Sequence, residues 1–443
     1  MTGKEKGLPL SRLLPLSLQH VFALFGATIL VPLLTGLNPL TALFTSAIGT
    51  ILFHFITGGK VPAYLGSSFA FITPIMVVAL KTLEDGTPGL GLGYAAATGA
   101  CIIAGLVYVL TAILVKVIGL KAIEKIIPPV VVGPVIMTIG LGLAGTAQSM
   151  SSVNIFIAIF TLAVVIIFSI YAKGFFKLIP ILIGLVAGYL VTLLLQTDVL
   201  QSLAFVHKYL LPEKLIDFSQ VTQAPWFALP KFVSEASYGS GNGIEFLLPR
   251  FTLPAIVAIV PAAIATMVEH LGDMLTISST TGKNFVEKPG LHRTLIGDGL
   301  ATSLAGFLGG PPNTTYSENV GVLAITRVYN PIVVQGAAVL VLIFSLSPKI
   351  GALLRTIPNP VMGGISILLF GMIASVGIRT LVEKRVDLSR VRNLVIVSTI
   401  VILGISGLAL GGLQGMGLGA VAGIILNLIL PNKEGNESSP QDN

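Results

Sequence analysis

Of the 443 residues, 10% are charged and 54% are hydrophobic, and the mean hydropathy is +0.94. A typical soluble domain carries roughly 25% charged residues, so this chain has too few polar groups to cover a water-facing surface. The uncharged runs 126–172 and 393–432 each exceed the about 20 residues of one membrane-spanning helix. Soluble, disordered and secreted proteins are excluded. Strong alternation at period two is missing, which argues against a barrel. The fold class predicted is an all-α polytopic membrane protein.

In chain order, twelve segments have the length and low charge of membrane spans. Two further segments are shorter and broken: Lys60–Ser68 leads into the apolar stretch Phe69–Leu80, and Gly309–Glu318 leads into Asn319–Val328. Counting both, we expect fourteen spans. The twelve continuous segments lie near residues 13–35, 38–57, 91–115, 128–147, 154–172, 178–197, 252–272, 294–310, 330–347, 359–380, 391–410 and 413–431.

The distribution of charge supports this number of spans. With fourteen spans and the N-terminus inside, 19 of the 26 basic residues fall on cytoplasmic loops, as the positive-inside rule requires. Omitting one broken segment would invert the following loops and erase this bias. We therefore expect both termini in the cytoplasm, and the net charge of +7 reflects topology rather than binding to nucleic acid. The first span is expected to remain uncleaved, and the polar tail 432–443 is expected to be disordered.

The longest stretch outside the membrane is predicted at residues 198–250. It contains the only tryptophan, Trp226, for which we predict a role as an interfacial anchor. The only cysteine, Cys101, lies in an apolar run and is expected to be a packed core residue.

The two halves of the chain repeat a pattern. Gly58–Pro62 resembles Gly309–Pro312, with Pro62 and Pro311 separated by 249 residues, and Ile127–Gly133 matches Ile357–Gly363. Seven spans per half is an odd number, so the halves enter the membrane from opposite sides and form a 7+7 inverted repeat. Such folds place substrate near the midplane, on discontinuous helices.

The broken segments, third and tenth in order, predict a specific local structure. We expect each to form a short strand that leads into a half-helix. The two strands would pair with each other in antiparallel fashion, because irregular backbone at this depth has no water to bond. The half-helix N-termini would then offer N–H groups to the carbonyl oxygens of a ligand.

Three carboxylates lie where charge is costly, and each is a candidate functional group. Glu269 and Asp273 are four residues apart and share one helix face, while Glu318 begins the second half-helix. Carboxylates that face one cavity repel each other, so protonation of Glu269 or Asp273 can be coupled to ligand binding. A location near a helix end, in contact with water, is the alternative for both. His270 is expected to face away from Glu269 and to have a packing or hydrogen-bonding role, and Asp298 is interpreted as helix-end chemistry. We expect neither a metal site nor a cofactor.

A signature in the second half resembles a known family. Glu318-Asn319-Val320-Gly321-Val322-Leu323-Ala324-Ile325-Thr326-Arg327 fits the pattern of the nucleobase–ascorbate transporters (nucleobase:cation symporter-2), an acidic residue, Gln or Pro followed by N-x-G-x-x-x-x-T-[RKG]. The fixed positions are Glu318, Asn319, Gly321, Thr326 and Arg327. Leu18–His20, Tyr64–Phe71 and Asn313–Tyr316 are similar to the bacterial uracil permease branch. The resemblance covers about Pro15 to Pro431.

The resemblance implies a division into two domains. Spans 1–4 (13–116) and 8–11 (251–347) would form a core that carries substrate. Spans 5–7 (117–197) and 12–14 (348–431) would form a gate domain. The stretch 198–250 would be a periplasmic connection, and a homodimer is expected.

It also implies the roles of particular residues. Glu269 and Glu318 would accept hydrogen bonds from the nucleobase. Phe69 would mark the start of the first half-helix, and Tyr316 and Ser317 would line the second.

One position departs from the family pattern. Uracil permeases carry His four residues after the glutamate, where this chain has Asp273, as purine transporters often do. Purine transporters, however, usually begin the signature with Gln, and this chain has Glu318. The uracil-like stretches favour uracil, and the proton-coupling role of the missing His is then expected to pass to Asp273.

The leading hypothesis is a proton-coupled uracil symporter of the bacterial inner membrane, working by alternating access. A xanthine or urate permease of the same family is the alternative. An anion exchanger with similar architecture is disfavoured by the carboxylates at the midplane, and a channel by the broken helices. An enzyme is disfavoured because no nucleophile or metal set is recognisable.

Overall fold

The computed structural model describes residues 8–81, 89–119, 128–202, 210, 214–230, 248–410 and 413–431. Some predictions therefore lie outside the described residues. These are the disordered tail 432–443, most of the loop between Lys81 and Gly91, much of the connection 198–250, and the basic residues Lys4, Lys6, Lys121, Lys125 and Lys433.

The described chain is mainly helical. The first half contains α1 (Leu10–Thr35), α2 (Pro39–Ile56), β1 (Leu65–Ser67), the 3-10 turn η1 (Phe69–Phe71), α3 (Ile72–Ala79), α4 (Tyr94–Ile118), α6 (Pro129–Gly142), α7 (Ala144–Ser152), α8 (Ile155–Tyr171), η2 (Gly174–Leu178) and α9 (Pro180–Leu195). The short helices α10 (Asp198–Gln201) and α11 (Ser219–Gln223) follow. The second half contains α12 (Leu253–Thr281), η5 (Val286–Gly290), α13 (Leu291–Phe307), β2 (Asn313–Thr315), α14 (Ser317–Thr326), α15 (Pro331–Ser345), α16 (Pro348–Arg355), α17 (Asn359–Glu383), α18 (Val391–Ile405), β3 (Ala409–Leu410), β4 (Leu413–Gln414) and α19 (Met416–Ile429).

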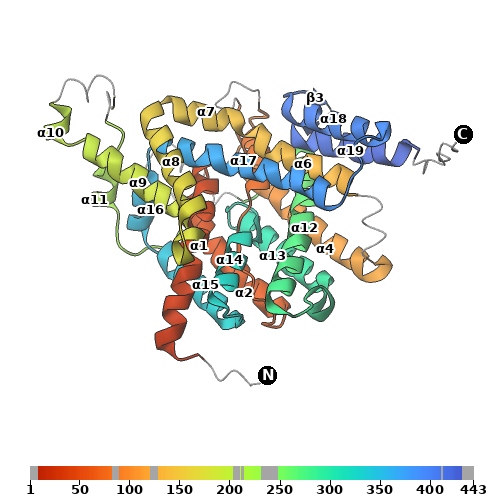
Figure 1. The fold of residues 1–443 in the computed structure, drawn as a ribbon, viewed down its shortest axis with the longest axis horizontal. Helices are drawn as coiled ribbons and strands as arrows, with labels where there is room; N and C mark the ends of the chain where they lie inside the picture. The colour runs from red at the N-terminus through yellow and green to blue at the C-terminus, as the bar shows by residue number, and fades with distance from the viewer. Residues whose placement is uncertain are drawn as a thin grey trace, which may run out of the picture.

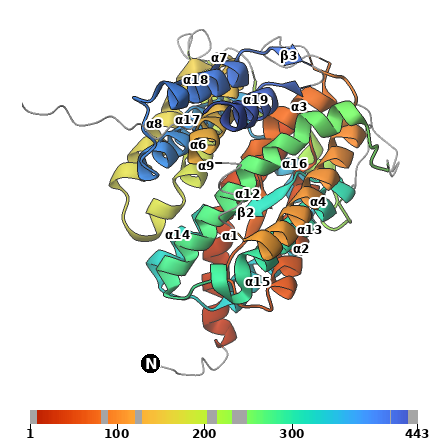
Figure 2. The same ribbon diagram turned by 90° about the vertical axis from the view of Figure 1, so that its right-hand side faces the viewer.

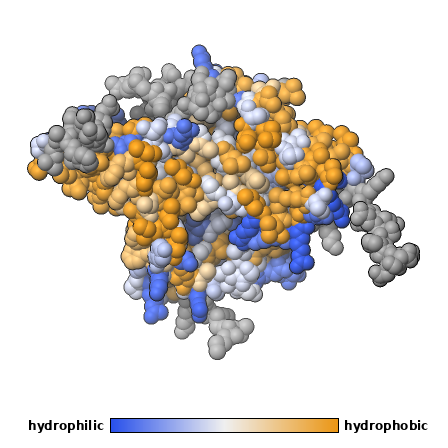
Figure 3. Space-filling model, turned by 45° about the horizontal axis from the view of Figure 1, so that its top comes forward, coloured by the Kyte–Doolittle hydropathy of each residue, from blue (hydrophilic) through white to orange (hydrophobic). Residues whose placement is uncertain are grey.

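These helices are those of a multi-pass membrane protein. Within the described ranges, 6 helices are long and apolar enough to cross a membrane, and α15 with α16, which meet at 83°, make a further bent candidate. Large apolar side chains such as Phe55, Val117 and Ile170 are exposed on the helix surfaces. Figure 3 shows hydrophobic side chains over most of the visible face, with hydrophilic ones gathered toward its lower edge. An apolar surface of this extent is suited to lipid rather than water.

The predicted pairing of the two broken segments is confirmed. Strand β1 pairs antiparallel with β2, with Gly66 opposite Thr314 at the centre of the register. Two flanking backbone bonds extend the pair: the Ser68 N–H donates to the Pro312 carbonyl at 2.9 Å, and the Tyr316 N–H donates to the Tyr64 carbonyl at 3.0 Å. Each strand therefore satisfies its backbone on the other, as a segment without access to water requires.

Side chains support the strand pair in the same way on both sides. The Thr50 hydroxyl of α2 donates to the Leu65 carbonyl at 3.1 Å, and the Thr302 hydroxyl of α13 donates to the Asn313 carbonyl at 2.6 Å. The two carbonyls that accept these bonds, of Leu65 and Asn313, lie 248 residues apart in the sequence. The flanking backbone bonds show the same spacing, between Ser68 and Tyr316 and between Tyr64 and Pro312. The sequence comparison gave 249, because it aligned the prolines rather than the paired backbone groups.

The helices form two sets. In the first set, α4 packs against α12 and α13, α2 packs against α13 and α15, and α1 packs against α15. In the second set, α17 packs against α6, α7 and α8, and α18 packs against α6 and α19. Figure 1 shows the second set as a band across the top of the view and the first set below it. Figure 2 shows α12 passing in front of β2 and beside α4, so the strand pair lies within the first set.

Several predicted boundaries differ from the structure. The segment predicted at 252–272 continues as helix to Thr281. In its polar final turns the hydroxyl groups are satisfied within the helix by carbonyls one turn back, for example Thr276 by Gly272 at 2.9 Å and Ser278 by Met274 at 2.6 Å. The segment predicted at 391–410 ends as helix at Ile405, and the small hairpin β3–β4 follows.

The crossing of α4 and α13 depends on glycine. A Cβ atom at Gly105 would lie 2.3 Å from the Gly299 carbonyl oxygen, which belongs to the backbone and cannot rotate away. We expect Gly105→Ala to destabilise the protein by about 1–3 kcal/mol through overpacking and to lower its melting temperature in detergent. The control is Gly371→Ala on the exposed face of α17, where no atom lies within 4 Å, and it should stabilise or leave the melting temperature unchanged. Equal melting temperatures for the two variants would contradict this close crossing.

Candidate functional site

The strand pair brings the starts of two helical segments into one region. β1 leads through Ser68 into η1 and α3, and β2 leads through Tyr316 into α14. Neither start carries a side-chain cap, so N–H groups of the first turns are left for another acceptor. Phe69 at the start of η1 is half-buried, whereas Ser317 at the start of α14 is exposed. These two predicted site residues thus lie at the helix starts, next to open space.

Tyr316 faces the strand pair instead. Its ring packs against Gly66, where a Cβ atom would lie 2.5 Å from the ring. Its hydroxyl donates to the Ser67 carbonyl at 2.8 Å and accepts a hydrogen bond from Thr28 at 3.2 Å. The side chain is 5% exposed. The Tyr316 side chain therefore links the two broken segments and α1. It points toward the strand pair and does not line the open space at the helix starts.

The carboxylates of α12 complete the region. Asp273 accepts hydrogen bonds from Ser317 at 2.5 Å and from Thr315 at 2.9 Å, which ties α12 to the end of β2 and the start of α14. Glu269 lies one turn earlier on the same helix and is exposed. It lies within Coulombic range of Asp273 and Glu318. Both residues are more than two turns from the helix end at Thr281, so the helix-end alternative is excluded.

Glu318 occupies the first turn of α14 and is half-buried. The N-terminus of a helix carries partial positive charge, so a carboxylate is favourable there. The predicted site residues Glu269, Asp273, Ser317 and Glu318 therefore gather around one point, next to the start of α14.

The other signature positions have structural roles. The Asn319 side chain contacts Nδ1 of buried His20 at 2.9 Å, which joins α14 to α1. A Cβ atom at Gly321 would lie 3.1 Å from Leu178 of η2 in the second helix set. The Thr326 hydroxyl donates to the Val322 carbonyl at 2.8 Å. Arg327 ends α14 in a left-handed conformation with φ 55°.

The structure corrects the interpretation of Asp298 as helix-end chemistry. α13 begins at Leu291, three residues before the predicted start, so Asp298 lies about two turns inside it and is fully buried. Its Oδ2 lies 3.0 Å from Nδ1 of His270, which is also fully buried. His270, expected to have a packing or hydrogen-bonding role, is buried and has polar contacts, but the sequence did not indicate Asp298 as its partner. An acidic residue within an apolar span was the available signal.

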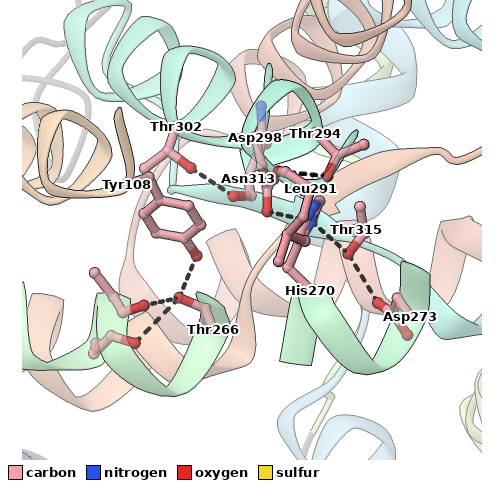
Figure 4. A network of polar contacts seen from close by, with 12 residues as sticks. Tyr108, Thr266, His270, Asp273, Leu291, Thr294, Asp298, Thr302, Asn313 and Thr315 are labelled. Carbon is pink, nitrogen blue, oxygen red and sulfur yellow. Dashed lines mark hydrogen bonds and ion pairs between the residues drawn. The ribbon is translucent and has the colours of Figure 1, made fainter. Parts of the chain in front are cut away.

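Figure 4 shows the polar network behind the site. The Thr315 hydroxyl lies 3.3 Å from Nδ1 of His270 and also bonds to Asp273, so it connects the buried pair to the site. Further along α12, the Tyr108 hydroxyl donates to Thr266. Sequence reasoning missed Thr315 and Tyr108, because neither residue stands out by type or spacing.

Comparison with known proteins identifies relatives over nearly the whole chain. The model of the Permease family, which covers the nucleobase–ascorbate transporters, matches residues 11–411. The uracil permease of Bacillus caldolyticus is 47% identical over 438 residues, covering 94% of this chain and 92% of that protein. The uracil permease of Escherichia coli (strain K12) is 40% identical over 416 residues, covering 91% of this chain and 87% of that protein.

Solved structures show a similar fold at low sequence identity. The transmembrane domain of the cyanobacterial bicarbonate transporter BicA has a TM-score of 0.55 at 15% identity, covering 95% of this chain and 97% of that one. SLC26A9 has a TM-score of 0.60 at 12% identity, covering 95% of this chain and 64% of that one. At these identities the likeness concerns the fold alone.

The backbone at Arg327 generates a prediction. The left-handed conformation suits glycine, one of the residues that the signature allows at this position, and strains β-branched side chains. We expect Arg327→Gly to be more stable than Arg327→Val by about 1–2 kcal/mol. Both variants lose the same charge, so the difference in their melting temperatures isolates the backbone. Equal values would contradict the left-handed end of α14.

Proposed function

Because the chain belongs to the nucleobase–ascorbate transporter family of permeases, we propose that it imports uracil by proton symport across a bacterial inner membrane. The protein is a permease and not an enzyme. The uracil permeases at 40–47% identity support a nucleobase as the substrate.

One observation carries the proposal: the carboxylates of α12 and α14 converge on the open starts of η1 and α14. Uracil is a planar ring with two N–H donors and two carbonyl acceptors. Glu269 and Glu318 would accept hydrogen bonds from the ring N–H groups, while helix-start N–H groups at Phe69 and Ser317 would donate to the carbonyl oxygens. An anionic substrate would meet carboxylates here, which disfavours anion exchange even though the similar folds include a bicarbonate transporter.

The fold that we propose has fourteen crossings in a 7+7 inverted repeat. Its support is the matched contacts on the two sides of the strand pair, where Thr50 and Thr302 play equivalent parts. The packing of α4 on α13 has its counterpart in that of α2 on α15 within this scheme. Beyond the six long helices, the crossings would be supplied by the two broken segments and by α8, α9, α13, α15, α18 and α19.

Transport by alternating access would use the two helix sets as core and gate. The core would comprise 13–116 and 251–347, and the gate 117–197 and 348–431. Small residues lie where the sets meet: a Cβ atom at Gly26 of α1 would lie 2.8 Å from Ile181 of α9. Glu269 or Asp273 would take up the proton, and the base would bind before the core moves.

The remaining assignments follow from charge and family. We place both termini in the cytoplasm, because 19 of the 26 basic residues then face that side. The connection 198–250 would be periplasmic. Trp226 in this connection is exposed and lies under the Lys349 ammonium group at 4.7 Å, which suits an interfacial position. The assembly would be a homodimer.

Uptake into proteoliposomes with an inward proton gradient tests the proposal. We expect Glu269→Gln and Glu318→Gln each to reduce uracil uptake by about tenfold or more, since a hydrogen bond to a charged group contributes about 1.5–3 kcal/mol. The control is Glu383→Gln, which removes an exposed carboxylate paired with Arg379 and should leave uptake unchanged. Wild-type uptake that ignores the proton gradient and persists in both variants would refute the proposal.

A xanthine or urate permease is the second candidate, favoured by Asp273 at the position where uracil permeases carry His. Competition separates the two. We expect a hundredfold excess of unlabelled xanthine to leave labelled uracil uptake intact, whereas unlabelled uracil abolishes it. The opposite pattern, with labelled xanthine transported and uracil unable to compete, would establish the purine permease.

A further inference from the structure

A continuous chain of polar contacts leads away from the site into the interior of the first helix set. The Thr315 hydroxyl lies 2.9 Å from Oδ2 of Asp273 and 3.3 Å from Nδ1 of His270. The same Nδ1 lies 3.0 Å from Oδ2 of Asp298. Figure 4 shows these side chains in one line, contributed by α12, β2 and α13. The two contacts of Thr315 are short enough for hydrogen bonds, so a proton can pass between Asp273 and His270.

At the interior end of this chain of contacts, His270 and Asp298 do not satisfy all of each other's polar atoms. Both side chains are 0% exposed, and in the described part of the chain His270 is the one basic group within ion-pair distance of Asp298. Nε2 of His270 and both carboxylate oxygens of Asp298 have no hydrogen-bond partner among the described residues, so the 3.0 Å contact between the two side chains is an ion-pair contact. Buried polar atoms normally find partners, and an uncompensated buried carboxylate is costly. The described chain therefore leaves hydrogen-bonding capacity unused at the interior end of these contacts.

The groups around His270 come from several elements of the first helix set. Apart from Asp298, the groups that face it are Thr315 of β2 and the ring edge of Phe53 from α2, whose centroid lies 6.4 Å away. Glu269 and Asp273 flank it on α12, and Glu269 lies within Coulombic range of Asp298. Tyr108 of α4 donates its hydroxyl proton to Thr266 instead. Within the described ranges, the charged groups near His270 are the carboxylates of Glu269, Asp273 and Asp298.

We propose that His270 is a second holding place for the coupling proton, reached from Asp273 through the hydroxyl of Thr315. This inference rests on the proposed proton symport. When Asp273 is protonated, its O–H donates to Thr315 and the rotated Thr315 hydroxyl donates to Nδ1 of His270. The Asp273 proton moves to the Thr315 oxygen while the Thr315 proton moves to Nδ1, and the reverse steps return it. The products are an Asp273 carboxylate and an imidazolium paired with Asp298.

The relay explains how the coupling proton can leave the substrate site without leaving the moving domain. All four side chains belong to the helix set proposed as the core, so the proton travels with the substrate. Asp298 acts as a positioning residue, because it orients the ring of His270 and stabilises its charge. Thr315 is the only link, since it is the one residue in the described chain that contacts both Asp273 and His270.

Two transport modes of the purified protein in proteoliposomes test the relay. Net uptake of labelled uracil requires the proton to be released and reloaded, whereas exchange of labelled for unlabelled uracil does not. We expect His270→Gln and Thr315→Val to reduce net uptake by at least about tenfold while exchange and uracil affinity change less than about threefold. Thr315→Ser, which keeps the hydroxyl, should retain both modes.

Each other outcome overturns the relay. Net uptake near the wild-type rate in both variants would show that the proton does not pass through them. Loss of exchange together with net uptake, or of net uptake in Thr315→Ser as well, would show a structural role only. If the wild-type protein itself takes up no uracil under a proton gradient, the proposed function fails first, which distinguishes that failure from failure of the relay.

Discussion

Backbone N–H and C=O groups inside a membrane have no water to bond, so each must find a partner within the protein. Strands β1 and β2 meet this requirement by pairing with each other, with Gly66 opposite Thr314. Neither segment could leave helical structure without the other. Their pairing fixes where η1 and α14 begin, and so it fixes where helix-start N–H groups face open space. The candidate site therefore exists because two distant segments satisfy one constraint jointly.

The carboxylates depend on the same pairing. Asp273 is held by hydroxyl groups from the end of β2 and the start of α14, and Glu269 projects from the adjacent turn into open space. Behind these carboxylates, the side chains of His270 and Asp298 are buried against each other in the interior of the same helix set. Under the proposed proton symport, the site would bind a neutral base and a proton together, and the ionisable groups that run inward from it would hold the proton.

Much of this arrangement could be predicted from sequence. The broken segments were visible because Gly and Pro interrupt otherwise apolar runs, and their pairing followed from the absence of water. Glu269 and Asp273 were visible because charge is rare in such a chain. Asp298 was misread, since the true start of α13 at Leu291 depends on the turn Val286–Gly290, which carries no apolar signal. The link through Thr315 could not be predicted, because it depends on strand register in three dimensions.

A structure of the protein with uracil bound tests the central claim most directly. The account predicts the base between the starts of η1 and α14, with its N–H groups toward Glu269 and Glu318 and a carbonyl oxygen toward a helix-start N–H group. Uracil bound away from the paired strands, or contacting none of these carboxylates, would contradict it.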